Sequence, residues 1–506
     1  MLLFEASTWA SASKQRASLQ CKSNNIHTTV RFTHPWAMAV MTKHSQRWQP
    51  ALRDSDKPVY LAIADAIGDD IQTGQLTADQ RLPTVRALSS TLRINFTTVA
   101  RAYAEAQRRG LINSKAGRGT FIRPTLRSQP IRAATASSLI DMTMNTPPEP
   151  QDPALLQRMR AGIEALQRTA DLHSLLRYQE FGGMPDDRDA GARWLQRYVP
   201  KLAPQCVLVC PGVQSALLAL FTVLARPGDT ICCEELTYPG IKGLAAHLGI
   251  HLKGLAVDDQ GIDPDAFAAA CAAGPPKALY VNPTFLNPTT AVMAQVRREA
   301  VVQIAQRYSV PIIEDDAYAA LPSRAPTALA ALAPELTFYV TGFAKSVGAG
   351  LRIAYLAAPN PRYTARLAAT LRTTSVMATS FTVALATRWI NDGTAEAATL
   401  AVREESRLRQ LCAKQILKRA DYSAKPEAFH LWLSVPAPWN RIEFATHLRA
   451  HGVGVVVSDT FAVSTAAPEA VRVCLGGSPP LQECRHTLEI IEDAIEQLPA
   501  VASKVM

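Results

Sequence analysis

The feature that most constrains the fold is a repeated alternation of short apolar runs and helix-like segments over residues 146–506. Runs such as 207–210, 278–281 and 312–314 are each followed by a turn, and a segment of helical character comes next along the chain. This alternation predicts a mostly parallel β-sheet covered by helices. Because such sheets bind ligands beyond the carboxyl ends of their strands, the polar residues that follow the runs form a candidate site.

One of these runs, 337–341, ends at Gly342 and presents Lys345. A lysine just past a buried strand is costly unless its amine is used. A desolvated lysine can form a Schiff base with the aldehyde of pyridoxal 5'-phosphate (PLP), and Arg352 can hold the cofactor phosphate bidentately. An ordinary exposed loop lysine is the alternative.

Other strand ends carry residues that suit the same cofactor. Asn287 lies in an N-P-T turn, where its amide could donate to a phenolate oxygen. Asp315 could pair with a pyridine nitrogen and keep it protonated, and Tyr318 could reach the phenolate from the same loop. Tyr238, before a proline, could stack on a flat ring, although a Tyr-Pro turn is the commoner explanation.

The Pro-Gly turn after residue 210 opens a further helix. Backbone N–H groups at a helix start bind phosphate, so Val213 and Gln214 are candidates, and Ser215 adds a hydroxyl. A plain strand-to-helix connection is the alternative.

The net charge of +10 is unevenly distributed along the chain. Residues 1–135 hold 19 Lys and Arg against 8 Asp and Glu, whereas the remainder holds 34 against 35. The basic N-terminal quarter therefore predicts a polyanionic partner for that part of the chain.

Three helical segments and a hairpin are predicted in this basic quarter, at 57–73, 84–92, 96–109 and 111–122. Together they predict a winged helix-turn-helix over 56–123 that binds double-stranded DNA. The residues placed to contact base edges or phosphates are Thr97, Thr98 and Arg101 on the third helix, Arg86 on the second and Arg118 in the wing. Solvated charges on a small helical domain are the alternative.

The rest of the chain divides around these two regions. Residues 1–55 are expected to be a disordered extension, 124–138 a flexible basic linker and 139–506 the cofactor domain. The nine cysteines show neither disulfide nor metal spacing and indicate reduced core thiols, and the longest uncharged run, 207–225, is interrupted by polar and turn residues, so no membrane span is expected.

The N-terminal motifs LPTVRAL, TTVARAY and GRGTFI resemble the GntR-type DNA-binding domain. The later motifs PGVQSAL, TYPG, NPT, EDDAY, FAK and GLR resemble, in this order, a fold type I PLP-dependent aminotransferase. That resemblance implies an α/β large domain with a mostly parallel sheet and a smaller α+β C-terminal domain. Gly342 and Thr290 depart from it, because they stand where Ser or Thr and glycine, respectively, are usual.

By the same resemblance, Lys345 is the lysine that binds PLP covalently, and the other residues named above keep the roles suggested for them. It adds Tyr178, which the neighbouring subunit of a homodimer would contribute to the phosphate site. It also adds Arg472, which would bind a substrate or effector carboxylate.

Joined, the two halves resemble the MocR-type subfamily of GntR regulators. That resemblance implies a cytoplasmic, homodimeric transcriptional regulator that senses an amino compound or PLP. The alternative is a working aminotransferase with an accessory N-terminal domain. The effector, the target genes and the direction of regulation are not readable from the sequence.

Overall fold

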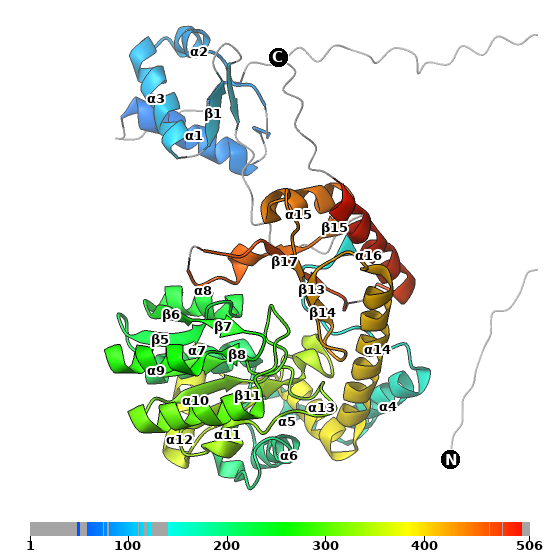
Figure 1. The fold of residues 1–506 in the computed structure, drawn as a ribbon. Coiled ribbons are helices and arrows are strands. Elements are labelled where there is room, and N and C mark those ends of the chain that lie inside the picture. The colour runs from blue at the N-terminus through cyan, green and yellow to red at the C-terminus, as the bar shows by residue number, and fades with distance from the viewer. Residues whose placement is uncertain are drawn as a thin grey trace, which may run out of the picture. The chain divides into compact units, whose positions relative to one another are not determined.

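The structure is a computed structural model that describes residues 48–50, 58–73, 75–77, 80–109, 111–115, 119–122, 140–464, 466–477 and 479–497. The chain divides into two compact units, Met1–Ala134 and Thr135–Met506. Both are drawn in Figure 1. The predicted linker and most of the predicted extension lie outside the described residues.

The first unit contains the three predicted helices and the hairpin. Their bounds are α1 Val59–Thr73, α2 Val85–Leu92, α3 Phe96–Arg108, β1 Ile112–Lys115 and β2 Gly119–Ile122. The Thr84 hydroxyl accepts from the Ala87 N–H at 3.2 Å and caps α2, and the Asn95 side chain caps α3 in the same way. Trp48, within the predicted extension, packs against the core of this unit and donates to Asp70 at 2.7 Å.

The second unit is built on a seven-stranded sheet in its large lobe. The strand order is β4-β12-β11-β10-β9-β5-β6, and only β12 runs antiparallel to its neighbours, so the predicted mostly parallel sheet is confirmed. The strands are β4 Val207–Cys210, β5 Thr230–Glu234, β6 His251–Leu255, β9 Ala278–Val281, β10 Ile312–Asp315, β11 Thr337–Gly342 and β12 Ala354–Ala357.

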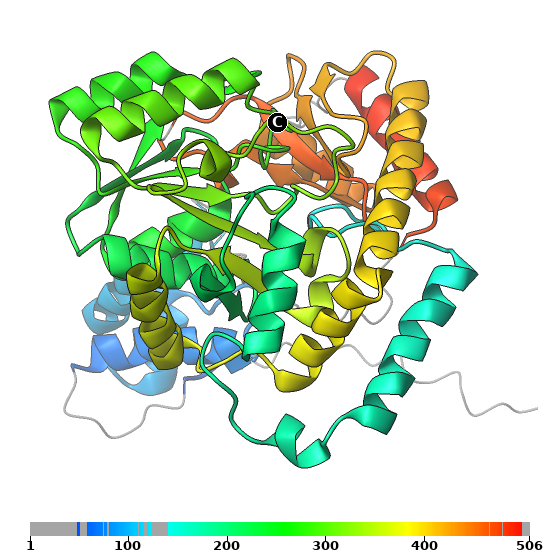
Figure 2. The same ribbon diagram turned by 90° about the horizontal axis from the view of Figure 1, so that it is seen from below.

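Helices cover both faces of this sheet because successive strand residues point to opposite sides (Figure 2). The neighbouring residues Ile313 and Ile312 of β10 show this, because Ile313 packs on one face and Ile312 on the other. The first face carries α7 Val213–Leu224, α8 Pro239–Leu248 and α12 Pro361–Thr374. The other carries α6 Pro185–Leu195, α9 Pro264–Ala273, α10 Gln295–Tyr308 and α13 Ser380–Asn391.

The small lobe has an antiparallel sheet in the order β13-β14-β17-β16. Its elements are β13 Tyr422–Ser423, β14 His430–Ser434, β16 Val456–Val457, β17 Ala470–Cys474, α15 Arg441–Ala450 and α16 Leu481–Glu496. A strand from much earlier in the chain, β3 Ile140–Asp141, pairs in parallel with β15 Val453–Gly454, and the Ile140 N–H donates to the Gly452 carbonyl at 2.7 Å.

The remaining elements connect these layers. The long helix α14 Thr394–Ile416 contacts α13 of the large lobe and α16 of the small lobe (Figures 1 and 2). The others are α4 Pro153–Thr169, α5 Leu172–Leu176, α11 Leu329–Leu332, the hairpin β7 Val257–Asp258 and β8 Gly261–Ile262, and the 3-10 turns η1 Pro204–Cys206, η2 Phe343–Lys345, η3 Ala349–Leu351 and η4 Ser458–Thr460.

In the described part of the chain, no helix is both long and apolar enough to cross a membrane. The eight cysteines within it are free, and all except Cys206 are buried.

Candidate cofactor site and DNA-binding surface

A cavity of about 140 Å³ lies beyond the carboxyl ends of the central strands of the large sheet. Eight of the predicted cofactor residues line it, although they come from segments far apart in the sequence. The lining residues are Val213, Gln214, Tyr238, Asn282, Asn287, Asp315, Ala317, Tyr318, Gly342, Ala344, Lys345 and Arg352. Most residues of this cavity were therefore predicted from their position after the apolar runs in the sequence.

One end of the cavity is suited to an anion. Gly212, with φ 91°, precedes α7, so the first N–H groups of that helix, at Val213 and Gln214, lie at the cavity wall. A Cβ at Gly212 would lie 2.6 Å from Arg352 Nη2, which shows how closely the guanidinium covers this helix start. A helix start and an arginine together form a phosphate-type site.

Asp315 is the last residue of β10 and is buried. Its Oδ2 accepts from the Tyr280 hydroxyl at 2.8 Å, and its Oδ1 has no hydrogen-bond partner among the described residues. Burial raises the pKa of this carboxyl to about 7. A buried carboxylate oxygen without a donor is unfavourable, so this atom suits a protonated ring nitrogen.

Lys345 ends the turn η2, directly after β11. Burial lowers the pKa of its amine to about 8, as the sequence argument for a desolvated lysine requires. Its Nζ donates to the main-chain carbonyl of Asn145 and lies 5.8 Å from the centre of the Tyr318 ring. The amine is therefore held at the cavity and is close to its neutral form at moderately alkaline pH.

Arg472, on β17 of the small lobe, reaches the same region. Its Nη1 donates to Asn287 Oδ1 at 2.7 Å, and its Nη2 donates to the Thr143 carbonyl at 2.6 Å. Because the amide oxygen of Asn287 is occupied, its amide nitrogen is left to donate to a ligand in the cavity.

Two of the ten predicted cofactor residues do not line the cavity within this chain. Ser215 does not line it, and its hydroxyl donates to the Pro211 carbonyl at 3.4 Å. Tyr178 is 80% exposed and also lies outside the lining.

The candidate DNA-contacting residues lie on the first unit. Arg86 and Thr97 are exposed, and Thr98 is half-buried. Arg101 is exposed as well, and its guanidinium lies 4.4 Å from the centre of the Tyr60 ring, a contact that the sequence argument missed. Arg118 lies outside the described residues.

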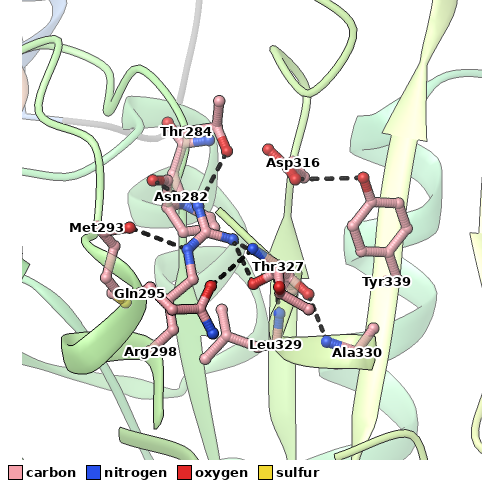
Figure 3. Close-up of polar contacts among 12 residues, drawn as sticks. Asn282, Thr284, Met293, Gln295, Arg298, Asp316, Thr327, Leu329, Ala330 and Tyr339 are labelled. Carbon is pink, nitrogen blue, oxygen red and sulfur yellow. Dashed lines mark hydrogen bonds and ion pairs between the residues drawn. The ribbon is translucent and has the colours of Figure 1, made fainter. Parts of the chain in front are cut away.

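A buried polar network around Arg298 was also missed (Figure 3). Arg298, 1% exposed, donates to the Met293 carbonyl at 3.0 Å and to the Thr284 hydroxyl at 3.3 Å. It also pairs with Glu314 at 3.5 Å, and Glu314 accepts from the N–H groups at the start of α11. These bonds tie the loop after β9, which carries Asn287, to the end of β10, which carries Asp315.

Gly342 has a steric reason to replace the usual serine or threonine. A Cβ at this position would lie 2.7 Å from the Ile353 carbonyl oxygen, which is closer than real Cβ contacts allow. We therefore expect Gly342→Ser to lower the free energy of unfolding by about 1–3 kcal/mol rather than to improve phosphate binding. Urea denaturation measures this, and Gly350→Ser, where nothing lies within 4 Å, is the matched control. Equal stability of the two variants would contradict the steric explanation.

Thr290 adopts φ 63°, a left-handed conformation in which glycine is easily accommodated, yet its side chain is fully buried. Glycine would adopt this conformation without strain, whereas Thr290 adopts it despite its β-branched side chain.

Comparisons with known proteins agree with this architecture. The model of aminotransferase class I and II matches residues 137–491, and that of bacterial regulatory proteins of the gntR family matches residues 59–122. An uncharacterized HTH-type transcriptional regulator of Bacillus subtilis, YdeF, is 27% identical over 89% of this chain and 97% of its own. The vitamin B6 salvage pathway transcriptional repressor PtsJ of Salmonella typhimurium is 27% identical over 58% of this chain and 66% of its own.

Among solved structures, an archaeal alanine:glyoxylate aminotransferase superposes with a TM-score of 0.64 at 23% identity, covering 70% of this chain and 90% of that one. It shows the fold of the second unit. The residues of the cavity fit PLP, since an anion site, an unpaired carboxylate oxygen and a half-buried lysine line one small volume. The predicted fold and its PLP cofactor are thus confirmed at the level of the family. The chain belongs to the aminotransferase class I and II family and carries a GntR-family DNA-binding domain, the combination that defines MocR-type transcriptional regulators.

Proposed function

We propose that this protein binds operator DNA through its winged helix and senses an amino compound, or PLP itself, through the cavity of its second unit. The observation that carries this proposal is the composition of that cavity, which joins Lys345, Asp315 and Arg352. When bound, PLP supplies an aldehyde that reacts with amines and a ring that withdraws electrons. Lys345 would hold the cofactor covalently, Arg352 and the start of α7 its phosphate, and Asp315 its ring nitrogen. As a DNA-binding regulator, the protein would act in the cytoplasm.

Two cations near the cavity, Lys345 and Arg472, suggest which effector fits. Lys345 and Arg472 both donate to main-chain carbonyls of the segment after β3, at Asn145 and Thr143. A ligand with a primary amine would compete for the aldehyde that Lys345 otherwise holds, and one with a carboxylate would draw Arg472 away from the Thr143 carbonyl. An amino acid carries both groups, so it would change how this segment is held. A ligand acts as an effector only through such a difference between two states.

The lowered pKa of Lys345 gives this site a characteristic pH dependence. Only the neutral amine attacks an aldehyde, and burial disfavours the ammonium form, so the amine is neutral above about pH 8. The rate of PLP attachment is expected to rise about tenfold per pH unit below pH 8 and to level off above it. Stopped-flow absorbance measures the profile. A rate that keeps rising to pH 10, as for an exposed lysine, would contradict the proposed environment.

We also propose a homodimer. Tyr178 and its neighbours Leu172 and Leu176 are 80%, 63% and 76% exposed, which leaves three large apolar side chains uncovered within one chain. Such a group is typical of a protein–protein contact. If a second subunit covers this segment, Tyr178 of one subunit would lie near Arg352 and the start of α7 of the other. Sedimentation velocity of the wild type and of Leu176→Glu tests this, since the variant is expected to shift toward monomer.

An active aminotransferase is the second candidate, favoured by the presence of both Lys345 and Arg472. To separate the two, PLP-loaded protein is mixed with a panel of amino acids, and spectra, keto-acid release and affinity for DNA upstream of its own gene are recorded. The regulator is expected to give one spectral change and at least a tenfold change in DNA affinity with one or a few amino acids. Sustained keto-acid release with unchanged DNA affinity would support the enzyme instead.

A further inference from the structure

Asn145 contacts three residues around the cavity, although it does not itself line it. Its side chain is 7% exposed. Its Nδ2 donates to the Tyr318 hydroxyl oxygen at 2.7 Å and lies 3.4 Å from His430 Nδ1, while its main-chain carbonyl accepts from Lys345. The residue therefore connects the segment after β3 with the large lobe.

The structure orients the Asn145 amide with its nitrogen toward Tyr318 and His430. Burial lowers the pKa of His430 to about 3, so its imidazole is neutral and one ring nitrogen can accept. The Tyr318 oxygen can accept as well. In this orientation the two protons of the amide nitrogen serve both acceptors at once.

This orientation decides where the Tyr318 proton goes. A phenol has one proton to donate, and the bond from Asn145 uses the oxygen only as an acceptor. Among the described residues, the Tyr318 hydroxyl makes no other hydrogen bond. Tyr318 lines the cavity together with Asn287, so its proton is available on that side.

We propose that Asn145 is a positioning residue for the cofactor: by donating to the Tyr318 oxygen, it leaves the Tyr318 proton for the ring oxygen of bound PLP. This rests on the proposed function, because it requires PLP in the cavity. Asn145 thereby acts on the cofactor through Tyr318, without touching it.

The test is the pH midpoint of the visible absorption band of the PLP-loaded full-length protein. A hydrogen bond to the ring oxygen disfavours the protonated chromophore, so losing it raises the midpoint. We expect Tyr318→Phe to raise it by about one pH unit and Asn145→Ala to raise it by roughly half as much. Asn145→Asp, nearly the same shape but only an acceptor when ionised, would draw the tyrosine proton to itself and match Tyr318→Phe.

Two further variants make the result specific. Adding Asn145→Ala to Tyr318→Phe is expected to give no extra shift, because the two residues act through one proton. Met144→Ala, a change at the neighbouring residue whose side chain is 51% exposed, is expected to keep the wild-type midpoint.

A wild-type midpoint in both Asn145 variants, or an equal Asn145→Ala shift with and without the Tyr318 hydroxyl, would overturn the inference while leaving PLP binding intact. If Asn145→Ala does not fold, the Asn145→Asp result decides. Absence of any visible band in the wild type would instead overturn the proposed function, and this inference with it.

Discussion

Replacing Lys345 by alanine is expected to abolish the shift of the PLP absorption band that the wild-type protein produces when PLP is added. This shift requires a covalent bond between the cofactor aldehyde and a protein amine, and Lys345 is the lysine that lines the cavity. The phosphate end formed by Arg352 and the start of α7 is unchanged, so some non-covalent binding is expected to remain. Absorbance titration and dialysis separate the two effects.

Lys253→Ala is the matched control, because Lys253 is exposed at the far edge strand β6 and does not line the cavity. It is expected to keep the full shift of the band. A wild-type shift in Lys345→Ala would mean that another amine holds the aldehyde, and the assignment of Lys345 would fail.

The combined change Arg86→Ala and Arg101→Ala is expected to weaken DNA binding by roughly 100-fold, since each arginine is predicted to make a phosphate or base contact. Both side chains are exposed, Arg86 on α2 and Arg101 on α3. If both neutralise phosphates, the slope of log affinity against log salt concentration should also fall by about 2. Fluorescence anisotropy with DNA from upstream of the gene, at several salt concentrations, measures both.

The control removes the same net charge from the second unit, through Arg307→Ala and Arg324→Ala, which are exposed there. Because this pair lies outside the winged helix, affinity and salt slope are expected to stay near those of the wild type. An equal loss in both double variants would show that overall charge, rather than these two residues, governs DNA binding.

The cavity residues could be predicted from their positions after strands because that prediction depends on topology alone. Once strands are parallel and adjacent, the residues that follow them meet at one edge of the sheet, whatever their separation in the sequence. Asp315 ends β10 and Lys345 comes shortly after β11; the two strands are hydrogen-bonded neighbours, and both residues line the cavity.

The residues that were missed depend on packing that no local pattern encodes. Asn145 lies in an irregular segment, and its partner Tyr318 is 173 positions away. Tyr280 resembles any buried strand aromatic until its hydroxyl is seen to reach Asp315. Ser215 has the expected position at the helix start, but its hydroxyl turns back to a carbonyl four residues earlier, as serine often does in a first turn.

The pairing of β3 with β15 has a consequence for signalling. Although most of the small lobe comes from the last fifth of the chain, the strand at Ile140 that follows the linker is hydrogen-bonded into it. A rotation of that lobe would therefore carry Ile140 with it, and so would move the point at which the predicted linker enters the second unit.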